Sequence, residues 1–389
     1  MKIAVVGAGA NGCFISYYLS KDGHQVILVE KEDEPVTSVN NAGLLTPELS
    51  PSPPVSMLKL ARASLIPSGP FYFSLKQILR NPGWVSAALH GIDEERKEAL
   101  VRFGRYSLQL FEEFFDRENC RETVSYRKGI IALYKSEGMG QISAQEIEKL
   151  GYRGFGSGHY LHEEISIDSH KLMQTLLSIL GSFPNVSITR AEVTGFLTEG
   201  RRVKSLLTSN GKIEAEAYVL ATGSYTQQLC MSIGFDARIL PARGLVMLFD
   251  TGGKQVVGSP AMLEDYGAAI AQHKNNVLRA TTFFELNGFK SFSKSRSEWL
   301  VGILRRHISE FPSLKLAYEG TGFRPCTPDQ LPLIGKIPNF DNLYLAAGHC
   351  RVGMTLAAST GKLISDMIAE KTVDERFVTV FDPSRFLKQ

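Results

Sequence analysis

Three glycines near the start of the chain have the spacing of a phosphate-binding turn. Gly7, Gly9 and Gly12 follow an apolar, β-branched run at residues 2–6 and introduce a helical pattern at residues 12–22. In that context Gly7 permits a tight turn, Gly9 admits a pyrophosphate close to the backbone, and Gly12 lets the helix pack on the strand. The N–H groups and positive dipole end of such a helix favour phosphate. We therefore predict a dinucleotide site here.

An acidic residue completes the pattern. Glu30 follows a second apolar run at residues 25–29. At the end of that strand its carboxylate can accept hydrogen bonds from ribose hydroxyls and would repel a 2′-phosphate. The fingerprint alone does not separate NAD from FAD, so the choice of cofactor depends on segments further along the chain.

Several later segments carry a resemblance to a known family. Residues 218–223 read YVLATG, residues 322–329 read GFRPCTPD, and residues 343–349 read LYLAAGH. Together with the fingerprint and the NAGL segment at residues 41–44, they resemble the D-amino-acid oxidase superfamily of FAD-dependent amine oxidoreductases. Within it, the D-amino-acid dehydrogenase, glycine oxidase and sarcosine oxidase branch is the most similar. The motifs follow the family's order over nearly the whole chain.

The resemblance implies an FAD bound in an extended conformation. The fingerprint would hold the pyrophosphate, the end of the second strand the adenosine, and the NAGL segment the flavin. The residues implied at the cofactor site are Gly7, Gly9, Ala10, Asn11, Gly12, Glu30, Lys31, Asn41, Ala42, Gly43, Leu44, Val193, Ala221, Thr222, Gly223, Arg324, Gly348, His349, Gly353, Met354 and Thr355.

The resemblance also bears on how the flavin is attached. In the sarcosine oxidase branch a cysteine bonds the flavin covalently, and the matching position here is Gly322, with Cys326 out of phase. We therefore expect noncovalent FAD. A helix at residues 355–369 would direct its N-terminus at the flavin N1–C2=O edge, where it favours the negative charge of the reduced state. Packing on the sheet is the alternative role of that helix.

An amino-acid substrate needs a cationic partner for its carboxylate, and the fork of an arginine matches two oxygens. Arg324 corresponds to the family's carboxylate-binding arginine, with an ordinary ion pair as the alternative. Arg243 and Tyr266 are further candidates at the substrate site. Arg351 departs from the family's usual segment and either enters the active site or faces solvent. His349 is an acid–base candidate by type, but the family requires no catalytic side chain, and we assign none.

The implied reaction is oxidative deamination of a small amino acid, such as a D-amino acid or a proline-like substrate. Hydride would move from the α-carbon to flavin N5, and the imine product would hydrolyse in water. A quinone or another carrier is the expected electron acceptor, with O₂ as the alternative. A glycine-, sarcosine- or L-proline-oxidising enzyme, alone or as a subunit of a complex, is the other interpretation. An NAD-dependent dehydrogenase would leave the later motifs unexplained.

The composition excludes several classes of protein. The 389 residues are 43% hydrophobic and 21% charged with a net charge of +3, which argues against disorder. Nucleic acid is not expected, because no basic stripe with interleaved aromatic residues occurs. No apolar run is long enough for a membrane-spanning helix. The five cysteines are scattered, so we expect neither a zinc ribbon nor a disulfide framework. The same scatter favours a cytoplasmic location. The oligomeric state stays open.

The pattern of elements predicts an α/β fold with two discontinuous domains. An FAD-binding Rossmann-like domain would comprise residues 1–50, 150–235 and 322–389, and an antiparallel-sheet substrate domain residues 51–149 and 236–321. Helices are expected at residues 93–118, 169–181, 297–309 and 355–369, with Asp168 capping the second. Strands are expected at residues 186–190, 193–197, 203–208, 213–220 and 343–347.

The segment at residues 55–90 is apolar but broken by Pro67, Pro70 and Pro82, which predicts short helices. It could cover the substrate domain, close over the active site as a lid, bind a partner, or contact the inner face of a membrane peripherally.

Overall fold

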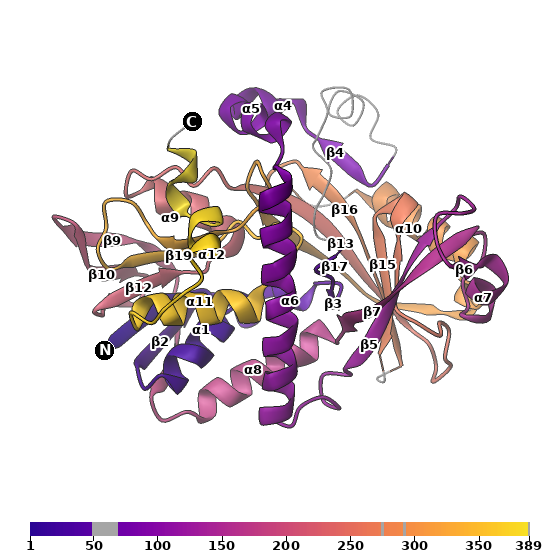
Figure 1. Ribbon diagram of the computed structural model, residues 1–389, viewed down its shortest axis with the longest axis horizontal. Coiled ribbons are helices and arrows are strands. Elements are labelled where there is room, and N and C mark those ends of the chain that lie inside the picture. Colours follow the sequence, from indigo (N-terminus) through magenta and orange to yellow (C-terminus); the bar gives the residue numbers. More distant parts are fainter. Residues whose placement is uncertain (49–68, 274–275, 291–292, 388–389) are drawn as a thin grey trace.

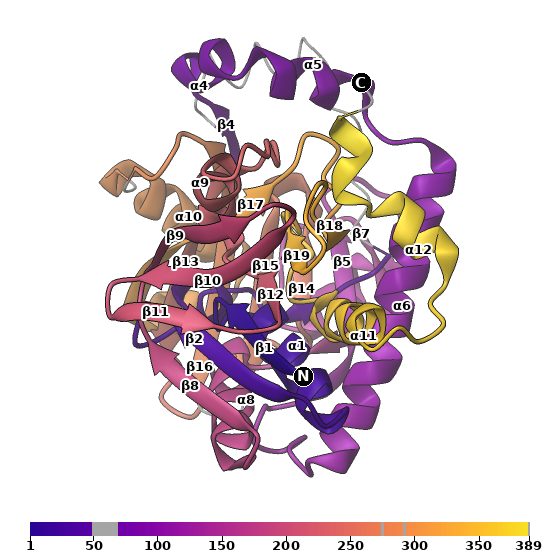
Figure 2. The same cartoon turned by 90° about the vertical axis from the view of Figure 1, so that its left-hand side faces the viewer.

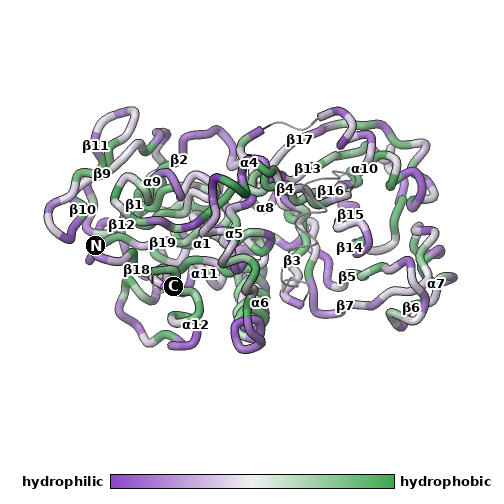
Figure 3. Tube along the Cα trace, turned by 90° about the horizontal axis from the view of Figure 1, so that it is seen from above, coloured by the Kyte–Doolittle hydropathy of each residue, from purple (hydrophilic) through white to green (hydrophobic). Residues whose placement is uncertain are grey.

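The computed structural model describes residues 1–48, 69–273, 276–290 and 293–387. Two lobes lie side by side in it (Figures 1 and 3). One lobe is built on a six-stranded sheet and carries both ends of the described chain, and the other is built on a ten-stranded sheet. The helix α6 (Glu94–Arg117) stands between them (Figure 1). The apolar residues Leu58, Leu60, Leu65 and Ile66 lie outside the described residues.

The six-stranded sheet assembles strands from distant parts of the chain. Its order is β18-β19-β12-β1-β2-β8, and every neighbouring pair is parallel except β18 with β19. The strands are β1 (Lys2–Val6), β2 (Gln25–Glu30), β8 (Val186–Arg190), β12 (Ala217–Leu220), β18 (Leu333–Lys336) and β19 (Leu343–Ala347). Because parallel strands place their carboxyl ends at one edge, the turn after β1 and the turn after β12 meet there.

Both faces of this sheet are buried, which explains the uninterrupted apolar runs of its strands. Ile3 and Val5 face the helices α1 (Ala10–Lys21), α8 (Ser169–Ser182) and α11 (Ala357–Ile368), against which α6 also packs. Ala4 and Val6 face the opposite way, toward Val203 in a three-stranded meander. The meander strands are β9 (Val193–Glu199), β10 (Arg202–Thr208) and β11 (Gly211–Glu214) (Figure 2). Because side chains alternate along β1, this strand contacts the helices on one face of the sheet and the meander on the other, so the lobe has three layers.

The ten-stranded sheet is mostly antiparallel. Its order is β17-β13-β16-β15-β14-β5-β7-β3, with β4 paired to β16 and β6 to β7, and the pairs β14–β5 and β16–β4 are parallel. The strands are β3 (Leu44–Leu45), β4 (Phe71–Phe73), β5 (Arg127–Tyr134), β6 (Ile142–Ser143), β7 (Ser157–Ser166), β13 (Leu240–Asp250), β14 (Ala261–Leu263), β15 (Ala268–His273), β16 (Val277–Leu286) and β17 (Lys315–Cys326). The helix α10 (Lys294–His307) buries Leu300 and Leu304 against it.

Short helices complete the described chain. They are α2 (Val36–Val39), α4 (Leu75–Arg80), α5 (Pro82–His90), α7 (Ala144–Lys149), α9 (Thr226–Met231) and α12 (Glu375–Val380), with 3₁₀ turns η1 (Gly223–Tyr225), η2 (Glu264–Tyr266), η3 (Phe311–Ser313) and η4 (Pro383–Phe386). The predicted break at Pro82 separates α4 from α5, and these two helices lie above the sheets (Figure 2). In the described part of the chain, none of the helices combines the length and the apolar character that a membrane crossing requires.

The predicted α/β fold class is confirmed, and most predicted elements fall within a few residues of their observed ends. Asp168 caps α8 as predicted, accepting hydrogen bonds from the backbone N–H of His170 and Lys171. The single strand predicted at residues 213–220 is wrong, because β11 pairs with β10 and the chain then bends at Glu216 to enter the other sheet as β12.

The predicted domain boundaries stay a prediction. Three contacts cross these boundaries: α6 of the predicted substrate domain packs on α11, β7 of the predicted FAD-binding domain pairs with β5 inside the ten-stranded sheet, and β17 of that sheet continues through the predicted boundary at residue 322.

Candidate active site

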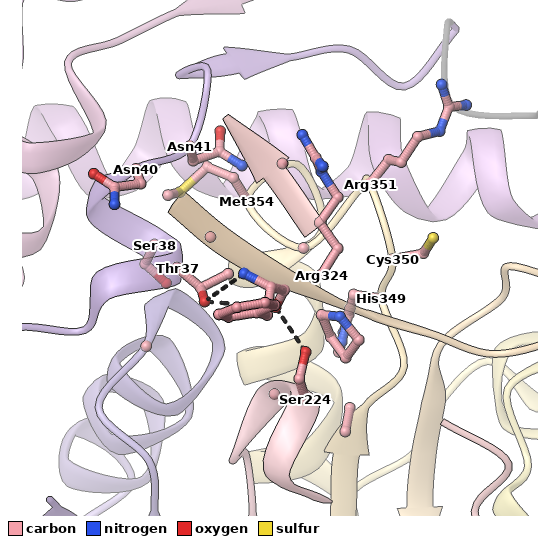
Figure 4. Close-up of a pocket in the computed structure, with 18 of the residues that line it drawn as sticks. Thr37, Ser38, Asn40, Asn41, Ser224, Arg324, His349, Cys350, Arg351 and Met354 are labelled. Atoms are coloured by element: carbon pink, nitrogen blue, oxygen red, sulfur yellow. Dashed lines mark hydrogen bonds between the residues drawn. The ribbon is translucent and has the colours of Figure 1, made fainter. Parts of the chain in front are cut away.

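A cavity of about 1220 Å³ lies between the two sheets. It is larger than most sites for a single small molecule, so it has room for a cofactor and a substrate together. At one end it reaches the turn after β1 and the end of β2, and at the other it reaches β13, β16 and β17. We refer to these as the nucleotide end and the substrate end. Figure 4 shows part of its lining.

The glycines of the fingerprint build the nucleotide end. Gly7 has φ +100°, and a Cβ there would lie 2.5 Å from the Ala221 carbonyl oxygen. A Cβ on Gly12 would lie 1.8 Å from the Gly7 carbonyl oxygen, so Gly12 keeps α1 close to the turn and faces away from the cavity. Gly9 lines the cavity, and the Ser38 hydroxyl accepts a hydrogen bond from the Ala10 N–H at 3.1 Å. The turn therefore presents backbone rather than side chains.

Glu30 is fixed at the cavity wall by backbone amides. Its Oε2 accepts a hydrogen bond from the Ala8 N–H at 2.7 Å, and its Oε1 accepts from the N–H of Lys31 at 2.9 Å and of Glu32 at 3.1 Å. The Lys31 ammonium lies 3.8 Å from the centroid of the Tyr225 ring. A carboxylate held this way is oriented to accept hydroxyl donors.

The segment at residues 41–44 is held by a buried cation that the sequence analysis did not identify. Asn41, Ala42 and Leu44 line the cavity, whereas Gly43, with φ +74°, packs against Ile167. Arg279 donates hydrogen bonds at 3.0 Å to the carbonyl oxygens of Val39 and Asn41 and lies 3.6 Å from an Asp168 carboxylate oxygen. Arg279 belongs to β16, so the ten-stranded sheet directly positions this segment of the cavity wall.

The loop before α11 closes the cavity beside the fingerprint. Gly353 and Met354 line it, and the Asn11 side-chain amide donates to the Gly353 carbonyl at 3.2 Å. The Asn11 Oδ1 atom is buried and has no hydrogen-bond partner among the described residues. Val193, Ala221, Thr222 and Gly223 also line the nucleotide end, as predicted. Gly348 and Thr355 lie behind the wall, since Thr355 accepts a hydrogen bond from the Thr46 N–H.

Arg324 lies at the substrate end (Figure 4). Its Nη1 donates a hydrogen bond to the Phe283 carbonyl at 2.8 Å, and a Cβ on Gly244 would lie 2.1 Å from the same Nη1. Burial, and then the neighbouring charge of Arg351, lowers the pKa of Arg324 to about 10, so it is a cation at neutral pH. Among the described residues no carboxylate pairs with it.

Arg351 lines the cavity and is also exposed to solvent, so the two orientations left open by the sequence both stay open. It extends on the same side of β17 as Arg324 (Figure 4). The surrounding protein lowers the pKa of its guanidinium, and the charge of Glu264, another lining residue, opposes that shift. The substrate end therefore contains two cations and one nearby carboxyl group.

Arg243 and Tyr266 do not line the cavity. The Arg243 guanidinium is bound by the buried Glu285 carboxylate, which also pairs with Arg296. The Tyr266 hydroxyl lies 2.6 Å from the His307 Nε2, in the core under α10. Neither residue supports the predicted contact with substrate. Strand pairing explains Arg243, because its neighbour Glu285 lies directly across on β16.

His349 is a buried neutral side chain. It lines the cavity, and its Nε2 lies 3.0 Å from the Thr360 hydroxyl. Burial lowers the pKa of His349 to about 3. The imidazole is therefore uncharged throughout the neutral range and holds the loop to α11.

One pair of cysteines forms a disulfide, although no disulfide framework was expected from the sequence. Cys326 and Cys350 are bonded, whereas Cys13, Cys120 and Cys230 are free and buried. Spacing could not reveal the pair, because β17 and the loop after β19 become neighbours only in the fold, where the Cys350 N–H donates to the Pro325 carbonyl. All five cysteines are described, and no free thiol lines the cavity.

The family model described as "FAD dependent oxidoreductase" matches residues 2–367. The chain belongs to this family. A D-amino acid dehydrogenase of Granulibacter bethesdensis is 27% identical, with 95% of this chain and 96% of the relative covered. Among solved structures, glycine oxidase from Geobacillus kaustophilus is similar with a TM-score of 0.76 at 20% identity, covering 98% of each chain. L-proline dehydrogenase from P. horikoshii gives a TM-score of 0.75 at 17% identity, covering 100% of this chain and 98% of the other.

The cavity fits the FAD that the family uses. The glycine turn leaves no side chain between the backbone and a pyrophosphate, Glu30 is oriented for hydroxyl groups, and the unpartnered Asn11 Oδ1 is available to a bound group. FAD is thus the cofactor of this family member, and the residues that would hold it are those of the fingerprint and of the segment at 41–44.

Several lining residues had no signal in the sequence. Glu264 and Tyr266 share the turn η2, which sends the carboxyl group into the cavity and the predicted tyrosine into the core. Phe283 has φ +71° and presents its carbonyl to Arg324. Trp84 lies in the proline-broken segment, whose contribution as a lid was one of the open alternatives.

Proposed function

We propose that the protein oxidises the α-carbon of a small D-amino acid with noncovalent FAD and transfers the electrons to a carrier other than O₂. The observation that carries the proposal is Arg324, a buried cation with its guanidinium fixed by the Phe283 carbonyl at the substrate end. An arginine fork in a low-dielectric cavity recognises a carboxylate with two charge-assisted hydrogen bonds. The D configuration and the class of acceptor follow the name of the curated relative.

The wall around Arg324 suits a compact apolar substrate. Phe73, Trp84, Phe283 and Phe284 line this end and exclude water from the α-carbon. Arg324 would hold the carboxylate and thereby orient the Cα–H bond, while Gly244 keeps the guanidinium's position free. Glu264 would balance the charge of Arg351.

When bound, FAD supplies the hydride acceptor that converts the amine to an imine. The side chains of the cavity then only orient the substrate and stabilise its charge. His349 stays neutral and takes no proton at physiological pH, because burial lowers its pKa to about 3. The family resemblance supports noncovalent attachment, since Gly322 matches the position of the covalent cysteine in the sarcosine oxidase branch.

The test is the visible spectrum of the holoenzyme, recorded without oxygen before and after addition of one amino acid at a time. D-proline and D-alanine should bleach the flavin faster than L-proline, glycine or sarcosine. A protein bleached only by the last three would replace the proposal by the alternative substrate class. Reoxidation of the bleached enzyme by a soluble quinone much faster than by air would support the dehydrogenase. Flavin that stays with acid-precipitated protein would refute noncovalent binding.

We also propose that α4 contacts a membrane surface peripherally. Leu75 and Leu79 of α4 are 60% and 72% exposed, Phe71 of the preceding strand β4 is 50% exposed, and α4 also carries the cationic residues Lys76 and Arg80. Such a patch suits the interface of an anionic bilayer. Leu79→Glu should abolish co-sedimentation with phosphatidylglycerol vesicles, whereas Leu316→Glu, at a residue on β17 that is 52% exposed, should not. Equal sedimentation of both variants would refute the contact.

A further inference from the structure

The disulfide Cys326–Cys350 lies at the substrate end of the cavity. Cys326 ends β17 two residues after Arg324, and Cys350 immediately precedes Arg351. The bond therefore links the two segments that carry the two cavity arginines. Cys326 is fully buried, whereas Cys350 is 5% exposed and lines the cavity. Of the two cysteines, Cys350 is therefore the one that borders the cavity.

Hydrogen bonds also hold the loop around Cys350. The Cys350 N–H donates to the Pro325 carbonyl at 2.7 Å, and His349 contacts Thr360. Cys350 itself has φ +48°, in the left-handed region that residues other than glycine seldom occupy. A covalent link is one means of maintaining such a conformation at a functional site. Opening the link would allow this loop to relax and Arg351 to move with it.

The surroundings also favour reaction at sulfur. Arg324 and Arg351 line the same cavity as Cys350, and each lies within two residues of one of the two cysteines; a cation close to a sulfur stabilises its thiolate. The Trp84 indole N–H donates to the Cys326 carbonyl at 3.2 Å, and Phe73, Trp84 and Leu286 pack in the same apolar cluster as the two cysteines. The free thiols Cys13, Cys120 and Cys230 are buried in the cores instead.

We propose that Cys326 and Cys350 form a reversible thiol–disulfide site that sets the affinity of the cavity for a substrate carboxylate. In the reaction, two molecules of a low-molecular-weight thiol reduce the disulfide, each cysteine sulfur gains one electron and one proton, and the two thiols leave as their own disulfide. The reverse exchange with a low-molecular-weight disulfide restores the bond. The bonded form holds Arg351 beside Arg324, and the dithiol form releases it.

The inference rests on the proposed substrate class, so its test uses two ligands. The holoenzyme is treated without oxygen with excess reduced glutathione, then with glutathione disulfide, and each form is alkylated before peptide mapping. The reduced form should expose Cys350 to iodoacetamide, and benzoate, a simple carboxylate, should protect it. KM for the amino acid and Kd for benzoate, read from the visible flavin spectrum, should rise about tenfold on reduction and return on oxidation, with kcat within about twofold.

Variants distinguish a reversible redox site from a disulfide with a purely structural role. Cys326→Ser/Cys350→Ser should have the KM of the reduced enzyme and no response to glutathione, whereas Cys120→Ser should keep the wild-type response. Wild-type enzyme without new reactive thiols after glutathione would overturn the proposal, as would thiols that appear with no change in Kd for benzoate. If the double variant does not fold, the glutathione titration of the wild type decides alone.

The two proposals fail in different ways. If no amino acid bleaches the flavin in either redox form, the proposed function fails, and the benzoate affinity in the two forms still decides the redox site. If an amino acid bleaches both forms with equal KM and benzoate binds both equally, the redox site fails and the proposed function stands.

Discussion

At the nucleotide end of the cavity, the centre of the surface is one glycine turn after β1, which presents backbone to the cavity. At the substrate end, single side chains arrive from η2, β13, β16, β17 and the loop before α11. The first end depends on local conformation and the second on the register between strands. Substitutions that displace residues should therefore have different consequences at the two ends. Displacement at the nucleotide end should weaken cofactor binding, and displacement at the substrate end should weaken substrate binding.

The largest effect is expected for Gly7→Ala. The new Cβ would lie 2.5 Å from the Ala221 carbonyl oxygen at a residue with φ +100°, so the turn must move away from the pyrophosphate. We expect Kd for FAD to rise more than about 100-fold, measured by the quenching of flavin fluorescence on binding. Gly211→Ala is the matched control, because Gly211 has φ +110° with nothing within 4 Å of its Cβ. If both variants lose FAD affinity equally, backbone strain alone explains the effect.

Arg324→Ala should leave FAD in place and weaken the substrate. The loss of a charge-assisted contact of about 2–4 kcal/mol corresponds to a KM about 30- to 1,000-fold higher. Arg243→Met serves as the contrast, because Arg243 is bound to Glu285 outside the cavity. It should lower the denaturation midpoint, because it removes one of the two arginines that pair with the buried Glu285 carboxylate, with KM nearly unchanged. An unchanged KM in Arg324→Ala would end the assignment of Arg324.

Gly244→Ala tests whether the substrate end depends on strand register. Its Cβ would lie 2.1 Å from the Arg324 Nη1, which would displace the guanidinium without removing its charge. We expect KM to rise about tenfold with kcat less affected, from initial rates over a range of substrate concentrations. Gly302→Ala on α10 is the control, because nothing lies within 4 Å of its Cβ. A KM equal to that of the control would mean that Arg324 adapts.

The smallest effect concerns pH. Arg324 loses its proton as the pH rises through about 10, so kcat/KM should fall, by about fourfold at half a unit above that pKa. His349→Asn should show the same profile between neutral and alkaline pH, because burial lowers the pKa of His349 to about 3. The measurement is kcat/KM against pH for both enzymes. A neutral-range titration that disappears in His349→Asn would contradict the assignment of a neutral histidine.

The nucleotide end was predictable because its information is local. Gly7, Gly9 and Gly12 need only their own strand and helix to adopt their conformations. The sequence around the fingerprint predicts both of these elements. The strands with two buried faces and the capped helix α8 are similarly explicit in the sequence. The family resemblance added the order of the later motifs, which local patterns do not give.

The substrate end was only partly predictable because it depends on pairing between distant strands. Arg243 and Arg324 lie on neighbouring strands, yet the first meets Glu285 and the second meets the Phe283 carbonyl. A shift of one residue in the pairing of the two strands decides whether an arginine forms an ion pair outside the cavity or lies in the cavity as a cation. The amino-acid composition does not reveal this register. The same holds for Cys326 and Cys350, which are neighbours only after the sheets form.

The position of β1 in the six-stranded sheet has a consequence during synthesis on the ribosome. One edge of β1 pairs with β12, whose first residue is Ala217, and β12 in turn pairs with β19. At the usual rate of translation the strand that carries the fingerprint waits roughly 10 to 40 s for that partner to be made. During this interval an apolar strand edge stays unpaired in the nascent chain. The growing polypeptide should therefore need a chaperone more than its finished form does.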